Sequence, residues 1–278
     1  MSTDIELKPS AESCWELWQA VRAKRPLVHC ITNFVSMDIM ANVLLAAGCS
    51  PAMAHSLDEV EAFVGISSAL LINMGTLSSE WVAAKKLAAR RAVELGKPWV
   101  LDPVGCGATP VRTTSCLQLL GCAPTVVRGN ASEILALAGV AVSGVRGVDS
   151  TAASRDALEA AKQLATAHKC IVAVSGEVDY VTDGKAVVGV RNGHELLTLI
   201  TAAGCSLTAL IAAFVTAAPR QPLLATAHAL AVFGLAGEEG LKLAPRPGPG
   251  SLRVTLLDML HLMDEATVKA GARIEVIA

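Results

Sequence analysis

The chain has 278 residues, of which 53% are apolar and only 17% are charged, with a formal net charge of −2. This length is near the upper size for one hydrophobic core, so we expect a single domain over residues 1–278. The slight negative charge argues against a nucleic-acid partner, because nucleic-acid-binding domains are usually basic. The apolar excess predicts association of identical subunits, since obligate interfaces are more apolar than ordinary surface.

Eight cysteines are scattered singly, with no Cys-x-x-Cys pair and no Cys/His cluster at zinc-ligand spacing. We therefore expect reduced thiols and a cytoplasmic protein. The opening stretch, MSTDIELKPSAESCWELW, has neither the basic nor the apolar region of a secretory signal. It is also too acidic for an ordinary transit peptide, although a removed one would leave no trace.

The first helix–strand pairs follow clear local signals. In chain order, the pattern predicts a helix over 10–24, a strand over 27–32, a helix over 36–48 and a further helix beginning at residue 56. Pro26 ends the first helix, and Gly48 is the expected left-handed residue after the second. Ser56 and Glu59 have the spacing of a capping box, which predicts that the third helix starts there.

Alternation of strands and helices continues to residue 176. Apolar runs predict strands over 69–74, 98–104, 124–129 and 170–176, and helical patterns predict helices over 79–95 and 150–168. Strands that read as continuous apolar runs between helices are typical of a parallel sheet covered on both faces. Asp183-Gly184 lies between two alternating segments and predicts a hairpin, after which the chain is mostly helical.

Residues 196–219 carry no charge, a length that could span a bilayer. Many Ala, Thr, Ser and Gly residues weaken that interpretation, and aromatic belts and Lys/Arg asymmetry are missing. We therefore expect a buried helix and no membrane partner.

Polar residues follow the predicted strands. Ligands of open α/β sheets bind beyond the carboxyl ends of the strands, so these residues should converge at one edge. They are Asn33, Met53 after a short 50–54 segment, Asn73, Asp102, the Arg128–Glu133 stretch and Ser175. Any one of them alone is explained by the polarity of strand ends, but the ordered set predicts a binding site.

The stretch VVRGNASEI, residues 126–134, has both structural and functional interpretations. Asn130 is a good N-cap and Glu133 can close a capping box, which accounts for both. Arg128 at a strand end calls for a carboxylate or a phosphate partner. Asp102, before a proline, either begins a turn or holds Mg²⁺ directly or through water.

ITAAGCSLTALIAAF, residues 200–214, leads into a helix predicted over 207–215. Unpaired amides at a helix N-terminus bind anions, and the small residues 202–204 let a phosphate approach. The positive electrostatic field of these amides is expected to lower the pKa of the Cys205 thiol enough to make thiolate near neutrality. Packing of Cys205 in the core is the common alternative, and the residues alone leave both open.

The chain resembles the hydroxyethylthiazole kinase family, of the ribokinase-like superfamily, over nearly its full length. The motifs that carry the resemblance, in order, are PLVHCITNFVSMDIMANVLLAAGCSPAMA, NMGTL, VLDPVGCGATPVRT, PTVVRGNASEI, VAVSGEVDYVTDG, TAAGCSLTALIAAF and GPGSLRV. The resemblance implies a three-layer α/β fold with a mostly parallel sheet. It also implies transfer of the ATP γ-phosphoryl group to the primary alcohol of 4-methyl-5-(2-hydroxyethyl)thiazole, with Mg²⁺.

The resemblance further implies roles for particular residues around the acceptor. Met53 matches the residue that contacts the thiazole, and Asn33 is expected to bind substrate beside it. Ala202 stands where the family usually has a glycine whose main chain touches substrate. Cys205 holds the place of the general base. The family is trimeric, with active sites between subunits.

The resemblance also implies a second set of residues, which bind the nucleotide and the metal. Arg128, Ser175 and Gly204 are expected to bind ATP, and Asp102 and Glu133 to associate with magnesium and the phosphates. Alternatives remain. Another ribokinase-like enzyme, such as a hydroxymethylpyrimidine kinase or a nucleotide-hydrate dehydratase, would normally present an acid at the position of Cys205. A non-enzymatic binding protein or a membrane hairpin would explain the apolar content but not the ordered polar set.

The one departure from the family pattern is Ala202. If this position needs a positive φ, the methyl group costs about 1 kcal/mol or more. If φ is ordinary, the methyl group only crowds the substrate pocket. We expect an ordinary φ, because Gly204, next to the anion site, is retained.

Overall fold

The computed structural model describes residues 6–139 and 150–277, and the nine strands of this part form one sheet. The strand order is β2-β1-β3-β4-β5-β6-β7-β8-β9. Neighbours from β2 to β6 are parallel, and those from β6 to β9 are antiparallel. The strands are β1 Leu27–Ile31, β2 Ser50–Ala52, β3 Ala69–Asn73, β4 Trp99–Asp102, β5 Val126–Asn130, β6 Ile171–Ser175, β7 Asp179–Thr182, β8 Val187–Val190 and β9 Ile274–Val276.

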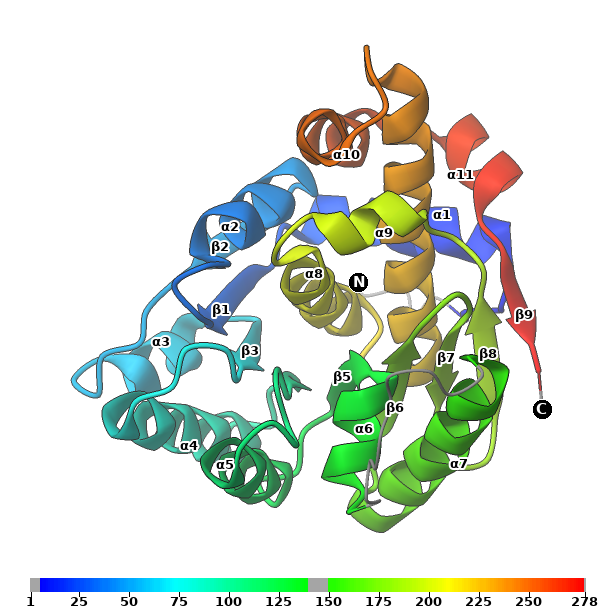
Figure 1. The fold of residues 1–278 in the computed structure, drawn as a ribbon. Helices are drawn as coiled ribbons and strands as arrows, with labels where there is room; N and C mark the ends of the chain where they lie inside the picture. The colour runs from blue at the N-terminus through cyan, green and yellow to red at the C-terminus, as the bar shows by residue number, and fades with distance from the viewer. Residues whose placement is uncertain (1–5, 140–149, 278) are drawn as a thin grey trace.

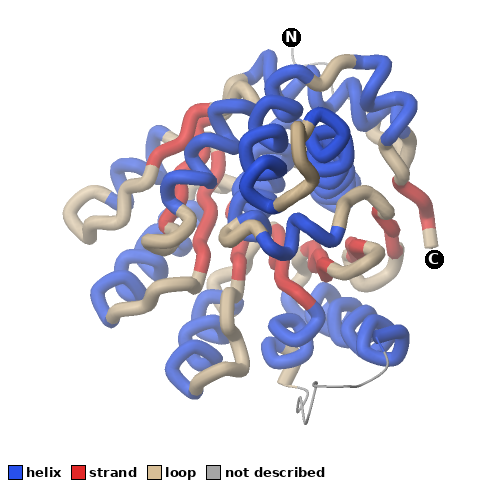
Figure 2. Tube along the Cα trace, turned by 45° about the horizontal axis from the view of Figure 1, so that its top comes forward, coloured by secondary structure: helices blue, strands red, loops and turns tan. Residues whose placement is uncertain are grey.

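Helices cover both faces of the sheet (Figure 1). One face carries α3 Val60–Ile66, α4 Ser79–Glu94, α5 Pro110–Leu120, α6 Ala131–Leu137 and α7 Ser150–His168. The other carries α1 Ala11–Lys24, α2 Met37–Ala46, α8 Ala203–Ala217, α9 Pro222–Leu243, α10 Pro249–Leu262 and α11 Glu265–Gly271, with the 3₁₀ helix η1 Glu195–Leu199 leading into α8. Figure 2 shows the strands as a row between the two groups of helices. The predicted three-layer α/β arrangement with a mostly parallel sheet is confirmed.

Each face of the sheet has its own hydrophobic core. On the α8 side, Trp18 of α1 stacks on Phe214 with ring centroids 5.7 Å apart. On the α4 side, buried Ala84 and Ala88 let that helix lie close to the sheet, and Trp99 donates its indole N–H to the Ala123 carbonyl. Continuous apolar strands are needed because both faces are covered.

Most predicted element boundaries agree with the structure to within a few residues, but the predicted starts of α3 and α8 are each wrong by four residues. Gly48 has a φ of +80° after α2, and Gly184 has a φ of +94° in the β7–β8 hairpin, as their turn positions predict. The capping box at Ser56 is wrong: α3 begins at Val60, and its N-cap Glu59 makes no side-chain cap bond. Ser56 Oγ accepts the Asp58 amide instead, in a turn before the helix. Strand β9, which is short and lies at the sheet edge, has no counterpart among the predicted elements.

The uncharged stretch 196–219 is divided between η1 and α8, which has 15 residues. Within the described part of the chain, no helix is both long and apolar enough to cross a membrane. The same stretch packs in the core on the α8 face of the sheet.

His228 of α9 predicts a pH-dependent loss of stability. The side chain is fully buried, and burial lowers its pKa to about 4. Because the unfolded chain binds this proton more strongly, the contribution to stability is intact above pH 6.5 and is lost as the pH falls toward 4, by roughly 3 kcal/mol. His228→Leu should therefore lose less stability than the wild type between pH 7 and 4.5, measured by urea unfolding. Parallel pH dependences of the two proteins would contradict this.

Candidate active site

The carboxyl ends of the central parallel strands meet the N-terminus of α8. Asn73 ends β3 and Asp102 ends β4, and the two are partners in the sheet register. Helix α8 packs across β1, β3 and β4, so its first turn lies over these strand ends. The parallel sheet thus brings polar side chains from separate motifs to one place, as the strand-end pattern predicts.

A chain of side-chain hydrogen bonds surrounds the Cys205 sulfur. Asn33 Nδ2 donates to Asn73 Oδ1 at 2.8 Å, and Asn73 Nδ2 donates to Asp102 Oδ2 at 2.8 Å. Asn73 Nδ2 also lies 3.2 Å from Cys205 Sγ, and Asn33 Nδ2 lies 3.9 Å from it. Thr208, one turn further along α8, donates to the same Asp102 oxygen at 3.0 Å. The sulfur therefore has polar neighbours on its sheet side.

The glycine of the NMGTL motif, Gly75, makes this series of hydrogen bonds possible. A Cβ on Gly75 would lie 2.5 Å from the Asn33 side chain, so only glycine lets the two segments approach. The Gly75 amide also donates to Asn73 Oδ1 at 2.9 Å. Asn33 Oδ1 in turn accepts the amides of Val35 and Ser36, which fixes its side chain in the loop after β1. Both asparagines are therefore held in one orientation.

Helix α8 begins earlier than predicted. It starts at Ala203 rather than Leu207, so Gly204 lies within the first turn and Cys205 is the third helical residue. Amides of the first turn have no carbonyl partner within the helix, and they carry the positive end of its dipole. The amides around Gly204 are therefore the ones available for the predicted anion site, and Cys205 lies in the same turn.

The prediction of an ordinary φ at Ala202 is wrong. Ala202 is the N-cap of α8 and has φ 61° and ψ 12°, in the left-handed region. A methyl group in this region costs roughly 1–2 kcal/mol, a cost that glycine would avoid. The retained Gly204 serves a different need, because a Cβ there would lie 2.7 Å from Arg128 Nη1.

Ala202→Gly is expected to raise the free energy of unfolding by about 1 kcal/mol or less, since the strain relieved exceeds the entropy gained by the unfolded chain. The neighbouring Ala203→Gly, within the helix, is the matched control and should lower it by up to about 1 kcal/mol. Chemical denaturation measures both. Equal losses in the two variants would show that Ala202 is not strained.

The predicted lowering of the Cys205 pKa is also wrong for the protein alone. Burial, and to a smaller extent the nearby Asp102 carboxylate, raise the pKa of the thiol to about 12. Hydrogen bonds from Asn73 and Asn33 and the charge of Arg128 act in the opposite direction and are weaker. The sulfur is nevertheless half-buried rather than sealed among aliphatic side chains. The helix terminus alone therefore does not make a thiolate at neutral pH.

A cavity of about 460 Å³ opens on the other side of Gly204. All three residues predicted to bind ATP, namely Arg128, Ser175 and Gly204, line it. Leu207, Leu230 and Phe233 give it an apolar side. A cavity of this size with apolar walls and a few convergent polar groups is typical of a small-molecule site. The cationic Arg128 beside the α8 amides makes one end of it suited to phosphates.

Several polar residues of the site had no predicted role, among them Asp179 and Thr208. Asp179, at the start of β7, lines the cavity, accepts the Gly176 amide at 3.0 Å and has a pKa raised to about 6 by burial. Thr208 holds Asp102, as described above. The signal for Asp179 is an acid within the alternating stretch VDYVT, and the signal for Thr208 is its position three residues after Cys205 on the same helix.

The predicted capping box at Asn130 is confirmed, and backbone amides inside and outside the box engage both oxygens of Glu133. Glu133 Oε2 accepts the Asn130 amide and Oε1 accepts the Gly105 amide, both at 3.0 Å. Burial raises the pKa of Asp102 to about 6, and Glu133 adds to this while Arg128 opposes it. Within the described residues, both hydrogen bonds to the Asp102 carboxylate fall on Oδ2, which leaves Oδ1 for another partner.

The Asp102 and Glu133 carboxylates suit one mode of magnesium binding. Across residues 6–139 and 150–277, no group of three or more His, Cys, Asp or Glu side chains could hold a metal. Mg²⁺ commonly binds through one or two carboxylates and completes its shell with phosphate oxygens and water. Asp102 and Glu133 suit that mode rather than a cage made by the protein.

Met53 lies directly after β2, half-buried against the core on the α8 face. This is the same edge of the sheet as Asn33. Contact of Met53 and of Asn33 with a substrate remains a prediction.

The chain is similar to known proteins over nearly its full length. The sequence pattern of the Hydroxyethylthiazole kinase family matches residues 18–266. A hydroxyethylthiazole kinase of Zea mays is 54% identical over 263 residues, covering 94% of this chain and 92% of the relative. One of Cereibacter sphaeroides is 51% identical over 264 residues, covering 95% of this chain and 99% of the relative.

Solved structures give the same result. The hydroxyethylthiazole kinase protein of Pyrococcus horikoshii OT3 has a TM-score of 0.87 at 42% identity, covering 95% of this chain and 99% of that one. Staphylococcus aureus pyridoxal kinase, in complex with pyridoxal, has a TM-score of 0.61 at 18% identity over 90% of this chain and 97% of that one, a likeness in fold alone. The predicted ribokinase-like fold is confirmed, and the chain belongs to the hydroxyethylthiazole kinase family.

Proposed function

We propose that this protein transfers the γ-phosphoryl group of ATP to the primary alcohol of 4-methyl-5-(2-hydroxyethyl)thiazole, as a step of thiamine salvage. The observation that carries the proposal is the α8 N-terminus. There Gly204 and Arg128 close one end of a nucleotide-sized cavity, and Cys205 begins a polar cluster on the other side. The names of the relatives supply the identity of the alcohol.

Nucleotide binding follows from the two halves of the cavity. The base and ribose lie along the apolar side, which includes Leu207, Leu230 and Phe233. The phosphates extend toward Arg128 and the first-turn amides of α8, where the guanidinium and the helix dipole stabilise negative charge. Ser175, whose hydroxyl is buried without a hydrogen-bond partner among the described residues, is a free donor for this ligand.

Mg²⁺ would be held by Asp102 and Glu133, directly or through water, and would neutralise charge that develops on the phosphates. Asp102 reaches it through the oxygen that Asn73 and Thr208 leave open. Their two hydrogen bonds fix the carboxylate while contributing no charge. The acceptor alcohol lies between Cys205 and the phosphates, with Met53, Asn33 and the main chain of Ala202 around the thiazole.

Cys205 serves as the general base. As the alcohol oxygen forms its bond to phosphorus, the hydroxyl proton moves to the Cys205 sulfur, and ADP leaves with the electron pair of the broken bond. Only the thiolate can accept that proton. Since the thiol pKa is about 12 in the protein alone, turnover should increase with pH above neutrality.

The assembly is proposed to be a homotrimer with active sites at subunit interfaces, and the chain to be a single domain. Phe34 and Val35, next to Asn33, are 67% and 61% exposed, and Phe34 packs only against Trp81 among the described aromatic rings, at 5.0 Å. An apolar pair so exposed beside the site suits burial by a neighbouring copy. Eight free cysteines suit a reducing compartment, so we place the enzyme in the cytoplasm.

The deciding assay is release of ADP from ATP with and without the thiazole alcohol, in the presence of Mg²⁺. Rapid release only with the alcohol, abolished by EDTA and restored by Mg²⁺, supports the proposal. Hydroxymethylpyrimidine in place of the thiazole is the matched control and should give little release. Preference for the pyrimidine would replace the proposed substrate, and no release with either alcohol would remove the kinase assignment.

A further inference from the structure

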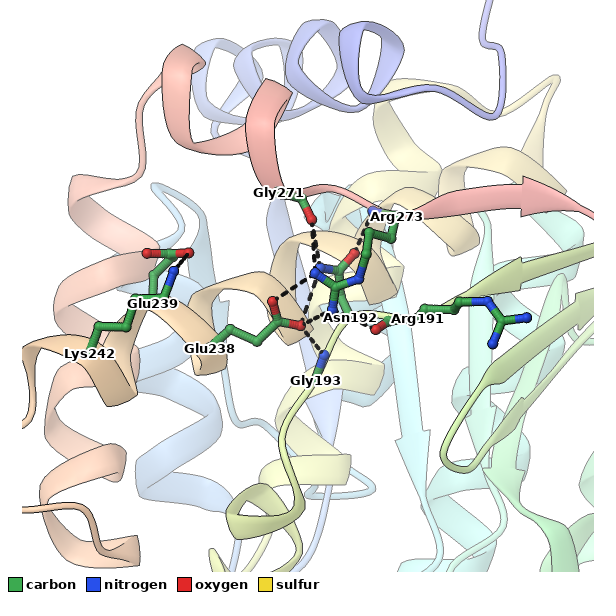
Figure 3. A network of polar contacts seen from close by, with 8 residues as sticks. All are labelled: Arg191, Asn192, Gly193, Glu238, Glu239, Lys242, Gly271 and Arg273. Carbon is green, nitrogen blue, oxygen red and sulfur yellow. Dashed lines mark hydrogen bonds and ion pairs between the residues drawn. The ribbon is translucent and has the colours of Figure 1, made fainter.

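A charged cluster lies behind one wall of the cavity (Figure 3). The wall is formed by residues 192–194, which follow β8 and line the cavity. Glu238 of α9 and Arg273, just before β9, contact the wall from behind. Neither Glu238 nor Arg273 is among the described residues that line the cavity.

The Glu238 carboxylate gathers four hydrogen bonds. Oε1 accepts the Gly193 amide at 2.6 Å, Arg273 Nη2 at 2.6 Å and Asn192 Nδ2 at 3.3 Å. Oε2 accepts Arg273 Nη1 at 3.1 Å, so the arginine binds the carboxylate with two nitrogens. This fork fixes the direction of the carboxylate, and one oxygen is thereby held against the backbone of the wall.

Asn192 ties the same wall to the C-terminal segment. Its Oδ1 accepts the Arg273 amide at 2.7 Å, and its Nδ2 donates to the Gly271 carbonyl at 2.9 Å. Arg273 also donates to the Arg191 carbonyl at 2.7 Å. Asn192 is only 7% exposed, so its position is set by these partners rather than by solvent.

Glycines of α9 bring the helix close enough for these bonds. A Cβ on Gly234 would lie 2.5 Å from the Asn192 carbonyl group, and one on Gly237 would lie 2.9 Å from Leu197 of η1. Both contacts face residues 192–198, the stretch that joins the hairpin to α8. The position of the wall relative to Gly204 therefore depends on α9 and its carboxylate.

We propose that Glu238 and Arg273 are positioning residues for the nucleotide, acting through Asn192 and Gly193; this rests on the proposed function of the cavity. Their ion pair is 17% and 48% exposed, and pairs of that kind add little to stability. Its consequence is geometric. Loss of the Arg273 fork, which aims the Glu238 carboxylate at the Gly193 amide, lets the wall move and changes the width of the cavity, while Cys205 and the thiazole side are untouched.

The test measures affinity for the magnesium complex of ADP by calorimetry, and KM and kcat by the ADP-release assay, in Glu238→Gln and Arg273→Ala. Each variant should raise Kd and the KM for ATP about five- to tenfold, the size of the net contribution of one ordinary hydrogen bond. We expect kcat and the KM for the thiazole to stay within about twofold, because removing binding shared by ground and transition states leaves kcat unchanged. Arg273→Lys, which keeps the charge but not the fork, should lie between Arg273→Ala and the wild type.

Glu239→Gln is the matched control. Glu239 pairs with Lys242 on the exposed side of the same helix, at 2.6 Å, and should leave all constants unchanged (Figure 3). Arg128→Ala tests the cavity itself. If Arg128→Ala does not weaken ADP binding, the proposed nucleotide site fails. If it does but Glu238→Gln and Arg273→Lys bind as the wild type, the positioning role is overturned. A uniform fall in kcat, both affinities and melting temperature would also overturn it, since that pattern reports general destabilisation.

Discussion

Cys205→Ser is expected to lower kcat by about 10²-fold or more, the usual size of a general-base contribution, with little change in the Kd for ATP. Serine has nearly the same size and can keep the hydrogen bond from Asn73. Its hydroxyl, however, cannot accept a proton at any pH at which the protein is folded. Steady-state kinetics and calorimetry with the magnesium complex of ADP measure the two effects separately. An unchanged kcat would remove the base role.

The pH profile of turnover gives a second test of the same sulfur. Because burial and the Asp102 charge hold the thiol pKa of the free enzyme near 12, its thiolate fraction and kcat/KM should rise by about tenfold per pH unit from pH 7 upward. Cys205→Asp is the matched variant, since a carboxylate is already ionised in this range. This variant should remain active at pH 7, and its activity should no longer increase with pH. A folded but inactive Cys205→Asp would count against proton transfer at this position.

Asp102→Asn is expected to lower kcat/KM by about 10²- to 10³-fold, the usual cost of removing one preorganised electrostatic group. Asparagine keeps the shape and one oxygen for the bonds from Asn73 and Thr208. It removes the negative charge that the magnesium complex of ATP requires. The KM for ATP should therefore rise, and raising the magnesium concentration should restore part of the loss. Full activity at low magnesium would exclude Asp102 from the metal site.

Asp102 also predicts the acidic limit of activity. Its pKa is raised to about 6, chiefly by burial, and the ionised form is the one that binds the metal. Since kcat/KM reports the free enzyme, its decline with falling pH should become steeper below pH 6 in the wild type and show no such break in Asp102→Asn. Thr208→Val is the matched control: it removes a hydrogen bond that lowers the Asp102 pKa, so the break should occur at higher pH. A break unaffected by either change would belong to another group, with Asp179 the first candidate.

The layers of the fold and the convergence of the site follow from local sequence patterns. Apolar runs separated by helical periods can only form a sheet covered on both faces, and parallel strands place all their carboxyl ends at one edge. Asn33, Asp102, Arg128 and Ser175 therefore lie at that edge whatever the details of packing. The capping box of Asn130 is equally local, because both partners lie in one turn of helix.

The sequence predicted the wrong local structure where one short pattern is compatible with two backbone conformations. Ser56 and Glu59 have capping-box spacing, but the chain forms a turn and the helix starts at Val60. Ala202 was assigned an ordinary φ because glycine is retained at residue 204. In the structure the two positions meet different demands: Ala202 turns the chain, and Gly204 makes room for Arg128.

The sequence by itself determined the family, the three-layer order and the edge of the sheet where chemistry can occur, because these depend on periodicity and on residues close together in the chain. Only the tertiary structure decided the ionisation of Cys205, since its pKa depends on how deeply α8 packs over β1, β3 and β4 and on the charge of Asp102. It alone paired Glu238 with Arg273, which are 35 residues apart. Burial and long-range contacts are properties of the packed chain, and no short stretch of residues contains them.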